Sequence, residues 1–354
     1  MTDAHDGTGS HENLVATLLS IEGPIKEEKS VRGQLDLGSM KLESKNVAMV
    51  VPNWVMTVKF MPCSSMRMVV AGDKVGNVGF WNMDSEEGND GRCLYRPHSG
   101  PISGILFRES CISQMFTSCY NGYVRMMDLE KGEFILVRKG VERLNCLTKP
   151  PNDDKSLYMG EGRGVLTVWD TKSGKPSSQL DLHSHLINTI DFNPGNSKIM
   201  ATGARDKTAK IWDLRFIRKG LPRCLKEVKH KDAVNSAYFS PSGAALATLS
   251  LDNYVGIQNG TNWDVNCMIP HVHGHSVRYI PKLRAIWGWD DSCILVGSME
   301  KAIDVISPVQ RGVVMSLDSP NMGTVPCRFD AHPQRVGLLA GAAAGGKVYV
   351  WTCS

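Results

Sequence analysis

The amino-acid sequence predicts an all-β fold, a seven-bladed β-propeller in which each blade is a four-stranded sheet. The first observation is a repeat: a hydrophobic strand, a second strand ending in small residues, a Gly/Asp/Asn turn and an alternating strand recur along the chain. The second observation is the period, because steps of 46, 42, 43, 46, 48 and 45 residues separate the closing positions of the third strands, Trp81, Met127, Trp169, Trp212, Gln258, Ile306 and Trp351. Seven copies at this period match the blades of a propeller.

The strands of each repeat can be placed in order. We expect the third strands at 75–82, 122–128, 164–170, 208–213, 253–259, 301–307 and 346–352. We expect the first strands at 55–62, 102–107, 144–148, 187–194, 234–241, 283–289 and 325–333. The second strands lie between them and read MVVAG, QMFTSC, SLYMG, IMATG, ALATLS, ILVGS and LLAGA. Such alternating or wholly apolar segments are typical of strands packed between neighbouring sheets.

The last repeat has no residues left for an outer strand, because its third strand ends two residues before Ser354. A propeller closes its ring by taking that strand from the other end of the chain, which also removes exposed strand edges. The segment 44–51, SKNVAMVV, has a suitable composition. The sequence therefore predicts a propeller over 44–354 and a polar, mobile extension over 1–43.

Composition excludes several classes of protein. The chain is 42% hydrophobic, enough for a sizeable core, and no segment approaches the roughly 18 apolar residues of a membrane span. The beginning lacks a secretory signal, and ten scattered cysteines without a CxxC pair indicate a reducing compartment rather than a disulfide scaffold or a zinc ribbon. Net charge is +4, with an acidic excess in the first fifty residues and a basic remainder, which is only weak support for a polyanionic partner.

The repeats resemble the Gly-His to Trp-Asp repeat of the WD40 family. A histidine precedes the first strand in several blades: His98, His183 or His185, His230, and His273 or His275. Blade four is the most complete copy, and we expect His185, Thr202, Asp206 and Trp212 to form a buried hydrogen-bond network there. This network resembles a catalytic triad but lacks an exposed nucleophile, so the sequence predicts no catalytic residue, no cofactor and no enzymatic activity.

The segment HVHGH (271–275) could suggest a metal site. No cysteine or carboxylate stands at the spacing of a zinc site beside it, so we expect no metal. GEGRG (160–164) lacks the full spacing of a phosphate-binding loop and opens a strand rather than a helix, which indicates a tight turn.

The segment IMATGARDKTAKIWDLR (199–215) resembles the DWD box of substrate receptors for cullin-4 ubiquitin ligases. The matching residues are Asp206, Trp212, Asp213 and Arg215. We expect Arg215 to emerge where the third strand ends, because it lies two residues past Asp213. An exposed guanidinium presents a fixed fork to a partner's carboxylate or carbonyl. The resemblance implies docking on the ligase's propeller adaptor, and the alternative is a well-formed repeat with an incidental arginine.

Cations gather in the turns between second and third strands, on the face where the central channel opens. The residues that we assign to DNA in these turns are Lys74, Tyr120, Arg163 and Arg205. Arg278, Lys282 and Arg284 join them from the long approach to the first strand of blade six, a loop that can reach the same face. Cations with tyrosines among them suit phosphate contacts and stacking on bases. An acidic peptide would suit the same cations.

Segments such as VVAGDKVGNVGFWNMD (69–84), TSCYNGYVR (117–125) and VRYIPKLRAIW (277–287) resemble the family of WD repeat-containing protein 76 and the fungal damage-binding WD-repeat proteins. The chain also resembles, more distantly, the small subunit of the UV-damaged-DNA-binding complex. The resemblance implies a nuclear, DNA-associated propeller that acts in the damage response and serves a cullin-4 ligase as a substrate receptor. We expect a monomer that binds double-stranded DNA, damaged DNA included. The alternative is a scaffold that reads peptides of chromatin-associated proteins.

Overall fold

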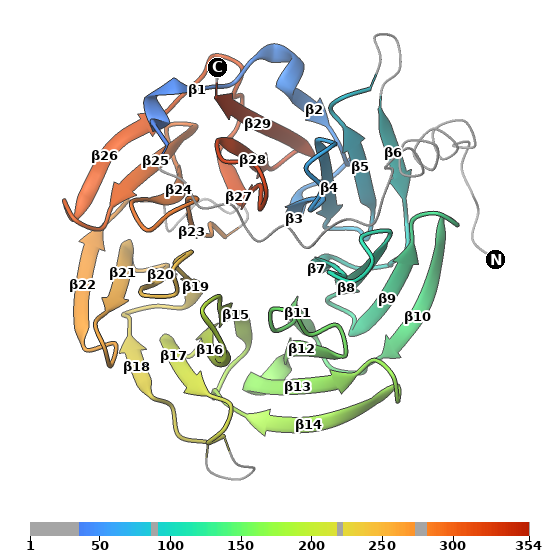
Figure 1. Ribbon diagram of the computed structural model, residues 1–354, viewed down its shortest axis with the longest axis vertical. Coiled ribbons are helices and arrows are strands. Elements are labelled where there is room, and N and C mark those ends of the chain that lie inside the picture. The colour runs from blue at the N-terminus through green and yellow to red at the C-terminus, as the bar shows by residue number, and fades with distance from the viewer. Residues whose placement is uncertain (1–34, 86–90, 218–221, 273–281, 354) are drawn as a thin grey trace.

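The computed structural model describes residues 35–85, 91–217, 222–272 and 282–353, and these residues form seven antiparallel sheets arranged in a ring (Figure 1). The predicted all-β, seven-bladed propeller is confirmed. The first strand of every blade surrounds the central axis, and the fourth strand lies at the rim (Figure 1).

The first four blades follow the chain without interruption. Blade one contains β3 (Val55–Phe60), β4 (Met68–Asp73), β5 (Val78–Asn82) and β6 (Arg92–Tyr95). Blade two contains β7 (Ile102–Phe107), β8 (Gln114–Cys119), β9 (Tyr123–Asp128) and β10 (Glu133–Lys139). Blade three contains β11 (Leu144–Thr148), β12 (Ser156–Glu161), η3 (Gly162–Gly164), β13 (Val165–Asp170) and β14 (Lys175–Asp181). Blade four contains β15 (Ile187–Asn193), β16 (Asn196–Ala204), β17 (Thr208–Asp213) and β18 (Lys226–Lys229).

The last three blades complete the ring. Blade five contains β19 (Val234–Phe239), β20 (Leu246–Ser250), β21 (Tyr254–Asn259) and β22 (Val265–Pro270). Blade six contains β23 (Ile286–Trp287), β24 (Ile294–Ser298), β25 (Ala302–Ser307) and β26 (Gly312–Leu317). Blade seven contains β27 (Pro326–Ala331), β28 (Leu338–Ala343) and β29 (Lys347–Cys353). The expected first, second and third strands are all present, although β23 is much shorter than the segment 283–289.

An N-terminal strand closes blade seven, as predicted. After η2 (Ser44–Asn46), β2 (Val47–Met49) pairs with β29, so that Val47 faces Tyr349 (Figure 1). A further strand that the sequence did not indicate, β1 (Met40–Lys41), follows η1 (Leu37–Ser39) and pairs with the end of β29. The strand pairing of blade seven therefore begins before residue 44, the expected start of the propeller.

The hydrophobic core lies between adjacent blades rather than inside any one of them. Every residue of β4 and of β28 is buried, whereas β14 at the rim is mostly exposed. One apolar cluster joins Val78 of blade one to Met115 of blade two. Because each sheet buries both faces against its neighbours, the inner strands become nearly continuous hydrophobic segments.

In blades one and three a glycine turn also contacts the segment that leads into the next blade. Gly76 and Gly164 have φ angles of 102° and 80°, a left-handed backbone that glycine adopts without strain. A Cβ at Gly76 would lie 2.0 Å from the carbonyl oxygen of His98, and one at Gly164 would lie 1.9 Å from that of His183. The turn of one blade thus packs directly against the segment that leads into the following blade.

Candidate nucleic-acid interface

The turns that carry the predicted cations lie on one face of the ring. The amide of Lys74 donates to the carbonyl of Trp54 at 3.0 Å, and that of Arg205 donates to Leu186 at 2.9 Å. Both acceptors immediately precede an inner strand. We call this side the channel-mouth face; it carries the turns 74–77, 120–122, 162–164 and 205–207 and the segments that enter the inner strands. Its opposite face carries the ends of the third strands.

Four of the predicted DNA-binding residues lie in these turns. Lys74, Arg163 and Arg205 are exposed, and Tyr120 is half-buried. The Lys74 ammonium lies 4.6 Å from the centre of the Trp54 ring. Arg163 takes a left-handed conformation, with φ 62°, in the tight turn of blade three. The three cations therefore come from blades one, three and four and share one accessible surface.

Lys282 and Arg284 lie nearer the axis than the sequence suggested. Both are half-buried, and Nη2 of Arg284 donates to the carbonyl of Asn188 in blade four at 3.1 Å. Burial, together with the charges of Arg205 and Arg143, lowers the pKa of Lys282 to about 8. The structure thus brings Lys282, Arg284 and Arg205 together, while Arg278 lies outside the described residues.

Two arginines of this cluster were missed by the sequence analysis. The guanidinium of Arg143 stacks 4.1 Å from the centre of the Tyr120 ring, at the start of blade three. Arg328 is 7% exposed and lies on β27. Burial and the neighbouring Arg284 lower the pKa of Arg328 to about 10. The available signal was a charged residue within an apolar inner strand, VPCRFDA, because such a residue can point only toward a neighbouring blade or the axis.

Acidic groups line the inner strands farther along the axis. Asp330 of β27 accepts from the Lys59 ammonium at 2.6 Å and from the Phe60 amide at 2.8 Å. Asp191 of β15 accepts from the Phe239 amide at 2.8 Å, and burial raises its pKa to about 7. Each of these two carboxylates lies four positions beyond the start of its strand, which places it toward the opposite face and away from the channel-mouth cations.

Blade four contains the expected internal network with a different histidine. His183, not His185, is the buried member: its Nδ1 lies 2.8 Å from Asp206 and its Nε2 lies 2.7 Å from the Thr202 hydroxyl. The Trp212 indole donates to the same hydroxyl at 2.8 Å. His185 is exposed because the Gly164 turn holds the backbone of His183 instead. The neutral tautomer with hydrogen on Nδ1 satisfies every group, so the network is structural.

The other histidines show how the repeat varies. His230 reproduces the contacts of His183, with Asp252 at 3.1 Å and Thr248 at 2.9 Å. His98 has Arg125 in place of an aspartate, and burial and that charge lower the pKa of His98 to about 3. In the segment HVHGH, buried His271 contacts Asp304 at 2.9 Å, whereas His273 and His275 lie outside the described residues.

The four residues of the predicted DWD box occupy different environments. Asp206 lies on the channel-mouth face and accepts from His183 and Thr208; these bonds outweigh burial and hold the pKa of Asp206 well below its usual range. Trp212 and Asp213 are buried, at 1% and 4% exposure. Arg215 lies on the opposite face with 54% of its side chain exposed, and Asp213 holds its guanidinium by contacts of 2.6 and 2.9 Å. Only Arg215 is therefore presented to a partner.

The opposite face also has a groove between blades two and three, of about 1180 Å³. Its lining includes apolar side chains, among them Ile135 and Leu136 of β10, which are half exposed. Glu109, Asp154 and Lys172 also line it. A groove lined by both apolar and oppositely charged side chains suits an extended peptide better than it suits a nucleic acid.

The described residues contain neither a cluster of metal-ligand side chains nor a helix that could cross a membrane. In the four stretches that the structure covers, no three His, Cys, Asp or Glu side chains are grouped as metal ligands. The same stretches contain no helix long and apolar enough to cross a membrane.

Comparison with known proteins finds WD repeats in part of the chain and similarity to WD-repeat proteins over most of it. The family described as "WD domain, G-beta repeat" matches residues 174–213 and 222–257, that is, parts of blades three, four and five. WD repeat-containing protein 76 of Xenopus laevis is 30% identical over 327 residues, which cover 89% of this chain and 56% of that protein. DNA damage-binding protein CMR1 of Debaryomyces hansenii is 26% identical over 362 residues, covering 84% and 60% respectively. DNA damage-binding protein 2 of Mus musculus is 28% identical over 303 residues, covering 80% and 68%. The chain thus spans only part of the length of each of these relatives.

Proposed function

Since this chain is a seven-bladed WD40 propeller homologous to proteins that carry the name DNA damage-binding, we propose that it binds double-stranded DNA in the nucleus and acts there in the response to DNA damage. The proposed contact surface is the channel-mouth face. Catalysis is not part of the proposed role.

One observation carries the proposal: exposed cations from three blades, Lys74, Arg163 and Arg205, share the face into which the axial cations also open. None of the three forms an ion pair with a described residue, so their charges are available to phosphates. Tyr120, stacked beneath Arg143, adds an aromatic surface to the same face.

The salt dependence of binding tests the proposal. Each phosphate contact on duplex DNA contributes about 0.9 to the slope of log K against log salt concentration. We expect a negative slope of at least about 2.7 from the three exposed cations when a short duplex is titrated between 50 and 200 mM salt. A slope near zero, or no binding at 50 mM, would contradict the proposal.

We further propose that the chain joins a cullin-4 ubiquitin ligase as a substrate receptor, through Arg215. The side chain lies on the face opposite the cations, which leaves DNA and the adaptor free to bind together. Asp213 fixes the guanidinium, so little conformational entropy is lost when a carboxylate or carbonyl of the adaptor meets its free edge.

We expect Arg215→Ala to reduce recovery of the ligase adaptor in pull-downs at least about fivefold, since a fixed guanidinium is a typical hot spot of an interface. Lys172→Ala is the matched control, because Lys172 follows the third strand of blade three at the equivalent position and is exposed. Equal recovery with the parent chain, Arg215→Ala and Lys172→Ala would remove the docking argument.

A second candidate function is a scaffold for peptides of chromatin-associated proteins, which the groove between blades two and three favours. Fluorescence titrations with an acidic peptide and with a duplex separate the two functions. The scaffold function would be favoured if the peptide binds and the duplex does not, and if the affinity for the peptide falls little as the salt concentration rises.

A further inference from the structure

Six of the seven inner strands share a feature near the channel mouth: a β-bulge interrupts each of these six at its start. The pairing with the second strand skips one residue in six blades, namely Met56, Ser103, Asn145, Asn188, Asn235 and Cys327. We call these residues, with the carbonyls beside them, the bulge layer. Bulges re-aim side chains and leave backbone groups without ladder partners.

Two guanidinium groups cross this layer. Nε of Arg328, from blade seven, donates to the carbonyl of Met56 in blade one at 2.7 Å, and its Nη1 donates to the carbonyls of Cys327 and Lys282. Arg284, from blade six, reaches past blade five to the carbonyl of Asn188. Both side chains therefore lie inside the ring of inner strands rather than on its outer surface.

These two arginines differ from the other buried cations of the chain. Arg138 is 9% exposed and forms an ion pair with Glu161, and the buried ammonium of Lys149 contacts both Glu109 and Asp154. For Arg284 and Arg328, no carboxylate of the described residues lies within ion-pair distance. Backbone carbonyls accept from both guanidinium groups, and the neutral Tyr238 side chain is a further hydrogen-bond partner of Arg284. Since burying a charge without a counter-charge is costly, such a site favours an anion.

An asparagine in the same layer provides a second, independent observation. The amide nitrogen of Asn145 donates a hydrogen bond to the amide oxygen of Asn188 at 3.3 Å. The amide nitrogen of Asn188 in turn donates to the carbonyl of Val234 at 2.7 Å. The next residue along, Asn235, is 2% exposed, and neither its amide nitrogen nor its amide oxygen has a partner among the described residues. It stands at the bulge of blade five, between the blades that Arg284 connects. A native interior rarely leaves both amide atoms unsatisfied, so a bound group is expected there.

We propose that Arg284 and Arg328, with Lys282 and Asn235, form a binding site inside the ring for a phosphate monoester dianion, either free phosphate or the terminal phosphate of a DNA strand. The strand-end source rests on the proposed DNA function, whereas the site itself does not. Guanidinium groups match phosphate oxygens in geometry and charge, and the Asn235 amide can donate to a third oxygen. The continuous backbone of an intact duplex is too bulky to reach a side chain buried this deeply, but a terminal or free phosphate is small enough.

The first experiment titrates the full chain with inorganic phosphate by calorimetry at pH 8. We expect saturable binding that Arg284→Gln together with Arg328→Gln weakens at least tenfold. Arg335→Gln is the matched control, because Arg335 also belongs to blade seven and donates to a carbonyl of blade one, that of Ser64, but lies on the opposite face. Arg335→Gln should leave the affinity within twofold. Absence of saturable binding to the parent chain, or equal affinities in parent and double variant, would overturn the site.

Proton uptake provides a measurement that needs no variant. Burial, together with the charges of Arg205, Arg143 and Arg328, lowers the pKa of Lys282 to about 8, so about half of this ammonium is neutral at pH 8. A dianion beside it raises the pKa again, and we expect phosphate binding to take up a substantial fraction of a proton. Calorimetry in buffers of different ionisation enthalpy measures that uptake, and zero uptake would place the phosphate away from Lys282.

The source of the phosphate is tested with three DNAs: a hairpin with a 5′-phosphorylated overhang, the same hairpin with a 5′-hydroxyl, and a closed dumbbell without ends. Tighter binding of the phosphorylated hairpin, lost in the double variant, would assign the site to strand ends. Equal binding of both hairpins, with phosphate still bound, would assign it to free phosphate. If phosphate binds but the dumbbell does not, the phosphate site is retained and the proposed DNA face is rejected. If the dumbbell binds but phosphate does not, the DNA face is retained and the phosphate site is rejected.

Discussion

The triple variant Lys74→Glu, Arg163→Glu, Arg205→Glu is expected to bind duplex DNA about 500-fold more weakly than the parent chain at 100 mM salt. Each phosphate contact contributes about 0.9 of a decade to the affinity at this concentration, and three contacts are lost. The loss should be the same for every DNA sequence, because contacts to phosphates carry no base information. Fluorescence anisotropy with two unrelated duplexes measures both quantities.

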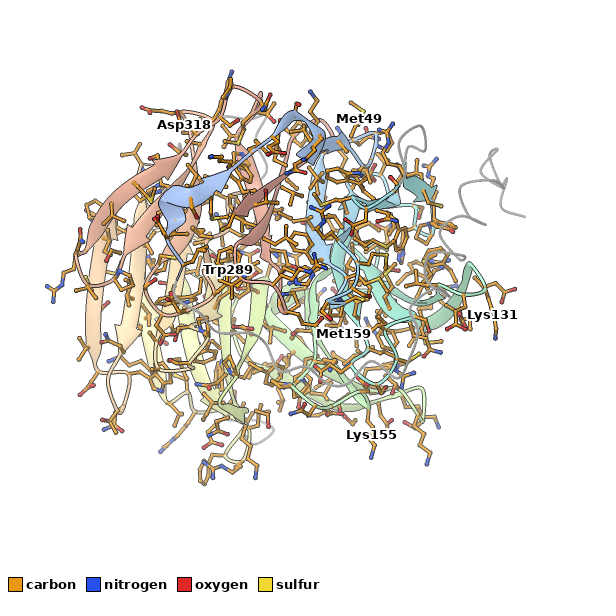
Figure 2. The ribbon with its side chains drawn as sticks, turned by 45° about the horizontal axis from the view of Figure 1, so that its top comes forward. Met49, Lys131, Lys155, Met159, Trp289 and Asp318 are labelled. Atoms are coloured by element: carbon orange, nitrogen blue, oxygen red, sulfur yellow. The ribbon has the colours of Figure 1, made fainter. Side chains whose placement is uncertain are left out.

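A matched reversal on the opposite face controls for net charge. The variant Lys131→Glu, Lys155→Glu, Lys172→Glu changes the charge of the chain by the same amount, and all three side chains are exposed. Lys131 and Lys155 project from the edge of the molecule, away from buried Met159 and Trp289 (Figure 2). We expect this control to lose less than about fivefold in affinity, since screening limits charges beyond about 10 Å. Equal losses in the two triple variants would mean that net charge, not a defined face, attracts DNA.

Trp212→Ala is expected to lower the free energy of unfolding by about 3–5 kcal/mol, the usual cost of removing a large, fully buried aromatic side chain. Trp212 is 1% exposed, packs beside Phe192 and Met200 in one core cluster, and donates to the hydroxyl that also contacts His183. Urea unfolding followed by tryptophan fluorescence and by circular dichroism measures the change in midpoint.

Two companion variants separate packing from hydrogen bonding. Trp212→Phe keeps an aromatic ring but removes the indole donor, and should cost about 1 kcal/mol beyond the change in volume. Trp169→Ala changes the equivalent residue of blade three, which is half-buried and whose indole nitrogen has no hydrogen-bond partner among the described residues. We expect Trp169→Ala to cost less than half as much as Trp212→Ala. If the urea midpoints of Trp212→Ala and Trp169→Ala are indistinguishable, the hydrogen-bond network of blade four adds nothing to stability.

The sequence predicted the ring because its signal is redundant. Seven closing positions share one period, so the weak copies ending at Gln258 and Ile306 could be placed by their neighbours even without a tryptophan. The prediction was wrong where two histidines in one segment could fill the same position in the network of blade four. His183 and His185 are only two residues apart, and the choice between them depended on the backbone hydrogen bond from His183 to Gly164, nineteen residues earlier.

The site was predictable only in its outer part. Lys74, Arg163 and Arg205 stand at fixed positions in turns, and the repeat itself fixes the face on which those turns lie. Arg328 and Asn235 could not be found in this way, because their significance comes from what is absent around them. That no carboxylate of the described residues pairs with Arg328 is a property of the assembled ring, since it depends on the residues that the other blades contribute to the axis.

The pairing of β2 with β29 joins two segments that are separated by nearly the whole chain. During synthesis β2 leaves the ribosome first and must wait for β29, while the earlier blades can already stack on one another. Until then the growing ring is an open arc with an unpaired strand edge at each end, vulnerable to chaperone capture or to pairing with another copy. The pairing of these two strands is therefore a late, non-local step, and we expect it to limit the rate at which the chain reaches the native state.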